Sequence, residues 1–254
     1  MPAMVDRAKV VIVTGASRGI GAATALMAAE QGFSVAVNCH QSPDEAAGVV
    51  RAIEDAGGRA VVIAGDVGEE ADVVHLFDET ERRLGPITAL VNNAGVSGTS
   101  GRLEALTIAD LTTVLRINVV GAFACSREAV RRMSTARGGQ GGAIVNVSSG
   151  AATLGSPGEF IHYAASKAAV DTLTIGLARE VAREGIRVNA VAPGMVLTDI
   201  HASSGDPGRV ERITPTVPMG RAGTVDEIAS TILFLLSDAA SYVTGAVLRV
   251  AGGR

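Results

Sequence analysis

The feature that most constrains the fold is an alternation between short, continuous apolar runs and amphipathic segments of helical length. Continuous runs without alternating polarity are typical of strands that helices cover on both faces. The runs are Val10–Val13, Val35–Val37, Ala60–Ile63, Ala89–Val91, Ile144–Val147, Arg187–Val191 and Ala246–Val250. Helix candidates lie near 19–31, 43–56, 70–83, 107–135, 159–184 and 225–236. The pattern predicts an α/β, Rossmann-type, doubly wound seven-stranded parallel sheet with helices on both faces.

Composition limits the function classes. The 254 residues show no break that marks a second domain, so residues 1–254 are expected to form one domain. A net charge of -4 with only 3% aromatic residues disfavours nucleic-acid binding, which needs basic stripes and stacking rings. Cys39 and Cys125 lack metal-ligand spacing and the histidines are dispersed, so no metal is predicted.

Two apolar stretches were considered as targeting or membrane segments. Val10–Val13 is too brief for the core of a signal peptide. Ile232–Leu236 falls well short of the about 18 residues that a membrane span needs. We expect a soluble, cytoplasmic protein without a membrane partner.

A glycine-rich turn follows the first predicted strand and opens the first helix. Glycine permits a tight turn and the close approach of a pyrophosphate, and a helix N-terminus offers unpaired N–H groups to it. The candidate cofactor-binding residues are Gly15, Ser17, Arg18, Gly19, Ile20 and Gly21. The spacing is GxxxGxG, not the generic GxGxxG, and tight packing alone is the alternative interpretation.

Two further strand ends carry candidate cofactor contacts. Asp66-Val67 supplies a carboxylate that can accept from an exocyclic amine such as that of adenine. Asn93-Ala94-Gly95 is compact enough for backbone contact with a cofactor. Each also fits an ordinary turn.

The chemistry-bearing pair is Tyr163 and Lys167, which share one helix face at i and i+4. An adjacent ammonium, with the positive ring of an oxidised nicotinamide, favours phenolate and is expected to lower the tyrosine pKa. Ser148 and Ser149 end the strand upstream, and either can donate to a substrate oxygen. His162 is expected to be a substrate-wall or surface residue rather than a base.

These segments together, with Asn118 and Pro193-Gly194, resemble the short-chain dehydrogenase/reductase family over nearly the whole chain. The resemblance implies catalytic roles for Asn118, Ser149, Tyr163 and Lys167, with the main chain of Asn118 holding a water that links Lys167 to solvent. Ser149 lies one residue further from the tyrosine than in typical members. By the same resemblance Thr198 binds the nicotinamide carboxamide, and the remaining cofactor contacts are Tyr163, Lys167, Pro193, Gly194 and Val196.

The resemblance also bears on the choice of cofactor. Members that prefer NAD carry an acidic residue at the end of the second strand, whereas Asn38–Ser42 contains none. Arg18 suits a 2′-phosphate because its donor fork fits phosphate oxygens, and Asn38, His40 and Ser42 can add hydrogen bonds. The prediction is therefore NADP(H).

The substrate is expected to be a small carbonyl compound or alcohol, covered by a lid near 198–218. The chain resembles both 3-oxoacyl-carrier reductases and glucose-dehydrogenase-like members, so a sugar 1-dehydrogenase remains an alternative. A non-catalytic NADP(H)-sensing protein is a further alternative, but it would lack the Tyr, Lys or Ser. The resemblance implies a homotetramer, or a homodimer, built partly through the helices 107–135 and 159–184. Ala251 replaces the family's usual acidic residue.

Overall fold

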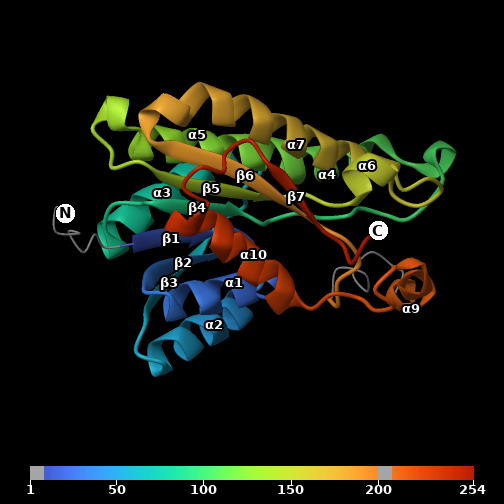
Figure 1. The fold of residues 1–254 in the computed structure, drawn as a ribbon, viewed down its shortest axis with the longest axis horizontal. Helices are drawn as coiled ribbons and strands as arrows, with labels where there is room; N and C mark the ends of the chain where they lie inside the picture. The colour runs from blue at the N-terminus through green and yellow to red at the C-terminus, as the bar shows by residue number, and fades with distance from the viewer. Residues whose placement is uncertain (1–8, 199–207) are drawn as a thin grey trace.

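A computed structural model describes residues 9–198 and 208–254. Seven parallel strands form one sheet in the order β3-β2-β1-β4-β5-β6-β7 (Figure 1). The strands are β1 Lys9–Val13, β2 Phe33–Cys39, β3 Arg59–Ala64, β4 Ala89–Asn92, β5 Gly142–Val147, β6 Ile186–Pro193 and β7 Val247–Val250. The predicted runs fall on these strands in order, so the predicted sheet is confirmed.

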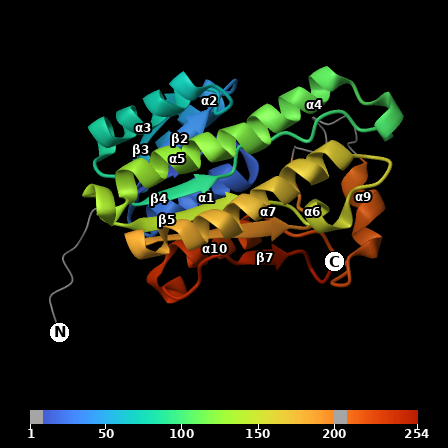
Figure 2. The same cartoon turned by 90° about the horizontal axis from the view of Figure 1, so that it is seen from above.

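Helices cover both faces of the sheet (Figure 2). On one face lie α1 (Gly19–Glu30), α2 (Pro43–Asp55) and α10 (Val225–Leu236), and on the other α3 (Glu70–Leu84), α5 (Gly121–Met133) and α7 (Ile161–Val181). Successive strand residues point to opposite faces, so β1 contributes to two separate cores. Val11 and Val13 pack in the first, and Val10 and Ile12 in the second. Burial on both faces explains why the runs are continuous.

The predicted helix 107–135 is not one regular helix. It consists of α4 (Ile108–Leu115), a π-helical stretch Arg116–Val120 and then α5. A π turn inserts an extra residue and is found mostly at functional sites. Asn118 lies inside this stretch.

Two short helices were not predicted. α6 (Ala151–Leu154) follows β5, and α9 (Arg209–Ile213) lies within the predicted lid near 198–218. The lid also contains a 3₁₀ turn at Thr214–Thr216, while its residues 199–207 lie outside the described residues. The lid remains a proposal, but its described part is partly helical rather than a loop.

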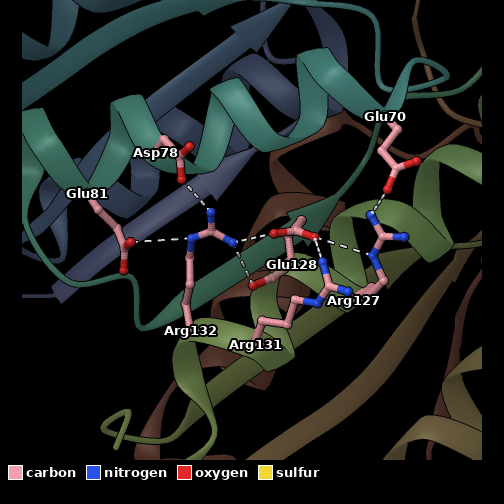
Figure 3. A network of polar contacts seen from close by, with 7 residues as sticks. All are labelled: Glu70, Asp78, Glu81, Arg127, Glu128, Arg131 and Arg132. Atoms are coloured by element: carbon pink, nitrogen blue, oxygen red, sulfur yellow. Dashed lines mark hydrogen bonds and ion pairs between the residues drawn. The ribbon is translucent and has the colours of Figure 1, made fainter. Parts of the chain in front are cut away.

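A buried carboxylate joins α5 to α3 on the second face (Figure 3). The side chain of Glu128 is 4% exposed and pairs with Arg131 at 2.8 Å and Arg132 at 2.5 Å. Arg132 reaches across to Asp78 of α3 at 2.5 Å and also lies over the ring of Phe77. This network fixes the two helices to each other.

Within the described residues, one helical run, Ile108–Met133, is long and apolar enough to cross a membrane by length and composition. Such a test is also passed by core helices of soluble proteins. Cys125, Ala129 and Met133 of this run pack into the core against the sheet. Packing therefore explains part of its apolar character.

The topology fixes where a ligand can bind. β1 pairs with β2 on one side and with β4 on the other, and the connections that follow these strands diverge. In open parallel sheets the crevice beyond the carboxyl ends at such a point is the ligand site.

Candidate active site

A cavity of about 1170 Å³ lies at this edge of the sheet. Its walls come from the turn after β1, the ends of the other strands, α7 and α9. All the predicted site residues line it except Gly21 and Asn118. Its volume exceeds the range of ordinary small-molecule pockets, so it has room for a dinucleotide together with a substrate.

The turn between β1 and α1 needs its glycines. Gly15 has φ +61°, a left-handed conformation that side chains disfavour. A Cβ at Gly21 would lie 2.4 Å from the Gly15 carbonyl oxygen and 2.5 Å from Asn93 Nδ2. Arg18, which precedes α1, forms no side-chain cap there. The first N–H groups of α1 are therefore available for an anion in the cavity.

Asn38 and Asn93 hold this turn with their side chains. Asn93 Nδ2 donates to the carbonyl oxygens of Thr14 and Gly15, both at 2.9 Å. Asn38 is buried, with Nδ2 donating to the carbonyls of Ile63 and Gly65 and Oδ1 accepting from the N–H of Gly15. The predicted contact of the Asn38 amide with a 2′-phosphate would require breaking these bonds.

The cavity mouth beyond β2 carries exposed cationic and polar side chains. Arg18 and His40 line the cavity, and neither side chain is hydrogen-bonded to another described residue. Ser42 lies beside them and precedes α2. No carboxylate lies between Asn38 and Asp44. The mouth is therefore suited to an anionic group.

Asp66 is already paired, with a partner that sequence reasoning missed. Its Oδ2 lies 2.8 Å from Arg116 Nη2, and its Oδ1 accepts from the N–H of Gly68. Burial acts to raise the pKa of Asp66, but these two donors outweigh it, and the pKa lies below its usual value. The carboxylate therefore stays ionised at the cavity wall. Val67 packs closely against Gly121.

Lys167 lies where the strand ends meet. Its Nζ is 5.7 Å from the centre of the Tyr163 ring and donates to the carbonyl of Val147 at 2.8 Å. A Cβ at Gly95 would lie 3.2 Å from Lys167 Nζ. Burial lowers the pKa of Lys167 to about 8, and the negative charge of Asp171 opposes that fall. The ammonium therefore titrates near pH 8 and is mostly charged at neutral pH.

Tyr163 faces Ser149, which separates the two candidate serines. The Ser149 hydroxyl lies near the phenol and acts to lower its pKa, whereas Ser148 is buried and donates to the carbonyl of Lys167. Burial raises the pKa of Tyr163, against the nearby Ser149 hydroxyl and the positive charge of Arg209. In the protein alone the pKa of Tyr163 is therefore raised, not lowered as expected.

Asn118 is buried behind this cluster, and its side chain is fully engaged. Oδ1 accepts from the N–H of Val96, and Nδ2 donates to the Val96 carbonyl, each at 2.8 Å. Nδ2 also lies 2.9 Å from Ser166 Oγ, which donates to the carbonyl of Tyr163. The side chain of Asn118 thus ties the turn after β4 to α7.

His162 is neither a surface nor a cavity residue, so that expectation was wrong. It is buried, and its Nε2 lies 3.6 Å from Asp110 Oδ2 without a hydrogen-bond partner. Adjacent residues on a helix point about 100° apart, which turns this ring away from Tyr163 and against α4. Among the residues that the structure describes, no cluster of His, Cys, Asp or Glu is arranged to hold a metal ion.

Two charged residues near the cluster were missed by sequence reasoning. Asp171 lies four residues after Lys167 on α7, a spacing that could have identified it. Arg209 lies on α9, and nothing in the surrounding Gly- and Pro-rich sequence singled it out.

Comparison with known sequences gives consistent matches. The family described as enoyl-(acyl carrier protein) reductase matches residues 15–254. An "uncharacterized oxidoreductase YgfF" of Escherichia coli is 52% identical over 96% of this chain and 99% of its own length. A 3-oxoacyl-[acyl-carrier-protein] reductase FabG of Staphylococcus aureus is 38% identical over 96% of this chain and 97% of its own length.

Solved structures agree with this. A dehydrogenase/reductase from Sinorhizobium meliloti superimposes with a TM-score of 0.90 at 37% identity, covering 96% of this chain and 94% of that one. A short-chain dehydrogenase from Burkholderia cenocepacia in complex with NADP gives 0.88 at 34% identity, covering 96% of each chain. A metagenomic blue fluorescent protein in complex with NADPH gives 0.88 at 35% identity, covering 96% of this chain and 97% of that one.

Proposed function

Because the chain belongs to the short-chain dehydrogenase/reductase family, we propose that it transfers hydride between NADP(H) and a carbonyl or secondary-alcohol carbon. It is an oxidoreductase acting on CH–OH or C=O groups. The observation that carries the proposal is that Tyr163, Ser149 and Lys167 share one cavity with the glycine turn after β1.

The residues present fit a phosphorylated dinucleotide. A Cβ at Gly21 would fill the backbone turn, and the α1 N-terminus has free N–H groups for a pyrophosphate. Arg18 and His40 provide uncommitted donors for a 2′-phosphate, and no carboxylate there repels it. NADP and NADPH are the cofactors named for two of the similar structures.

The bound cofactor supplies or accepts the hydride at its nicotinamide. In carbonyl reduction the Tyr163 hydroxyl donates its proton to the substrate oxygen as hydride reaches the carbon. Ser149 holds that oxygen, since it lines the cavity beside Tyr163. In alcohol oxidation the same groups act in reverse, with Tyr163 as the base.

Lys167 supports the proton transfer by electrostatics. Its ammonium favours the phenolate that remains after the proton leaves. The carbonyl of Val147 holds Nζ in place, and Asn118 keeps α7 against the turn after β4. We propose that the proton lost by Tyr163 is replaced from Lys167, which is in turn reprotonated from solvent through a water held at the main chain of Asn118.

The proposal extends to the assembly. We propose one domain, with the segment near 198–218 as its substrate lid, and a homotetramer or homodimer built through α4, α5 and α7. Exposed apolar side chains support this assembly: Ile108 on α4, Phe123 on α5, and Val120 in the π-helical stretch between them.

The test is NADPH consumption, followed by its absorbance, against diketones, quinones, β-ketoesters and aldehydes, with sugars tested in reverse using NADP. At least one carbonyl class should be reduced, with a higher kcat/KM for NADPH than for NADH. Arg18→Ala should reduce the ratio of kcat/KM for NADPH to kcat/KM for NADH. Reaction with sugars alone would establish the sugar-dehydrogenase alternative. Tight NADPH binding without any turnover would instead identify a sensor.

A further inference from the structure

Arg209 lies at the Tyr163 end of the cavity. Figure 2 shows α9 beside α6 and the start of α7, and Arg209 is the first residue of α9. Its guanidinium carbon is 4.6 Å from the centre of the Phe160 ring, and its Nη2 lies 2.8 Å from Glu159 Oε2. Arg209, Glu159, Phe160 and Tyr163 all line the same cavity. The ring thus supports the guanidinium at the wall of the cavity.

One donor of this guanidinium, its Nε–H, is not satisfied. Arg209 Nε is buried and has no hydrogen-bond partner among the residues that the structure describes. Glu159 does not serve Arg209 alone, because its Oε1 also pairs with Arg212 at 2.9 Å. A buried donor on a charged group is costly when it has no acceptor. An acceptor supplied by a ligand would remove that cost.

The position of Arg209 distinguishes it from the cofactor-binding residues. The residues proposed for the cofactor phosphates and adenine, such as Arg18, His40 and Asp66, lie after β1, β2 and β3, whereas Arg209 packs on Phe160 in the segment that leads into α7. The positive charge of Arg209 is also felt at Tyr163, where it acts to lower the pKa of the phenol. An anion bound here would lie on the substrate side of the cavity.

We propose that Arg209 binds a carboxylate on the substrate, so that the enzyme acts on oxo carboxylates or the corresponding hydroxy acids. The inference rests on the proposed oxidoreductase function and specifies its substrate class. Arginine binds carboxylate through charge-assisted hydrogen bonds, for which the Nε–H is free. A cofactor phosphate offers the same oxyanion chemistry, and the experiment separates the two sources.

The experiment compares α-, β- and γ-oxo carboxylates with their methyl esters, which keep the reacting carbonyl but remove the charge. The kcat/KM of the wild type should favour one acid over its ester by about tenfold or more, the value of a charge-assisted bond. Arg209→Gln should abolish that preference by raising the KM for the acid, and Arg209→Lys should restore part of it. Arg212→Gln, on the same helix and the same carboxylate, is the matched control and should keep the preference.

Each other outcome has a definite meaning. If the wild type reduces esters and acids equally well, the inference fails while the proposed function stands. If Arg209→Gln weakens NADPH binding and leaves the acid-to-ester ratio unchanged, the anion is a cofactor phosphate and the inference fails. If no compound consumes NADPH, the proposed function fails. Calorimetric binding of the oxo carboxylates then tests Arg209 directly, and equal affinity in wild type and Arg209→Gln overturns the inference.

Discussion

A single buried ammonium, that of Lys167, connects the proton chemistry to pH. Burial lowers its pKa to about 8, and the nearby carboxylate of Asp171 opposes the shift. The pKa of Asp171 is itself raised by burial, against the nearby Ser148 hydroxyl and the charges of Lys167 and Arg249. One Asp171 oxygen is buried without a hydrogen-bond partner. Asp171 is therefore placed to keep Lys167 charged, acting through it rather than on the substrate.

Replacing Asp171 by Asn tests this role. Carbonyl reduction needs a charged Lys167 and a protonated Tyr163, so kcat/KM should fall as pH rises through about 8. Removing the negative charge lowers the pKa of Lys167 further, and the fall in kcat/KM should move to lower pH. Glu180→Gln, at an exposed site on the same helix, is the control. If kcat/KM falls at the same pH in Asp171→Asn and in the wild type, Asp171 does not act on Lys167.

The turn between β1 and α1 makes a prediction about binding and stability together. Gly21→Ala forces a Cβ to within 2.4 Å of the Gly15 carbonyl. The backbone must shift, at a cost of about 1–3 kcal/mol in unfolding free energy, and NADPH binding should weaken with it. Gly48→Ala in α2 meets only the end of Arg51 at 3.9 Å and should stabilise by about 0.5–1 kcal/mol. Fluorescence titration measures the NADPH affinity of both proteins. Equal affinity in Gly21→Ala and wild type would contradict the assignment of this turn as the pyrophosphate site.

The α3–α5 contact makes a prediction about stability and pH. Glu128→Gln leaves Arg132, which is 15% exposed, without its buried partner and should cost about 3 kcal/mol at neutral pH. Burial acts to raise the pKa of Glu128, but the arginines outweigh it and lower the pKa. This stabilisation is present above the unfolded pKa of about 4.3 and is lost as pH falls through the folded value.

Urea unfolding at several pH values measures this directly. The difference between wild type and Glu128→Gln should shrink below about pH 4. Glu79→Gln breaks an exposed pair with Arg82 and is the control, with no change expected in the midpoint. If the difference in unfolding free energy between wild type and Glu128→Gln is the same at low and neutral pH, the charge of Glu128 is not the source of the stabilisation.

The regular elements were predictable because each depends on local pattern. The runs from Val10 to Val191 are continuous because both faces of the sheet are buried there, whereas the edge strand β7 is partly exposed. The glycine turn follows from the need for positive φ at Gly15. The break at Arg116–Val120 was not predictable, because the residues there are ordinary helix formers and the π turn depends on tertiary contacts.

The site residues also differ in whether the sequence alone could predict them. Tyr163, Lys167 and Ser149 could be placed in one site because strand ends and helix spacing bring them together. The partners of Asn38 and Asp66 could not be foreseen, since Gly65 and Arg116 reach them only through the fold. Arg209 comes from a segment without periodicity, so only the structure places it beside Phe160.

The exposed apolar face over α4 and α5 makes a prediction about the whole molecule. Ile108, Val120 and Phe123 are 76%, 54% and 50% exposed. Light scattering should therefore give a mass that is a multiple of the 25.7 kDa chain. Phe123→Glu should shift the protein to a smaller species, and Arg51→Glu on α2 should not. A monomeric wild type would rule out the proposed assembly.

The most direct test of the account is deuterium transfer from NADPH labelled at nicotinamide C4. With a carbonyl compound that the wild type reduces, mass spectrometry should find deuterium on the carbinol carbon of the product. Tyr163→Phe should bind NADPH with nearly wild-type affinity and yield less than a few per cent of that product. Labelled product formed by Tyr163→Phe at the wild-type rate would contradict the assignment of Tyr163 as the proton donor.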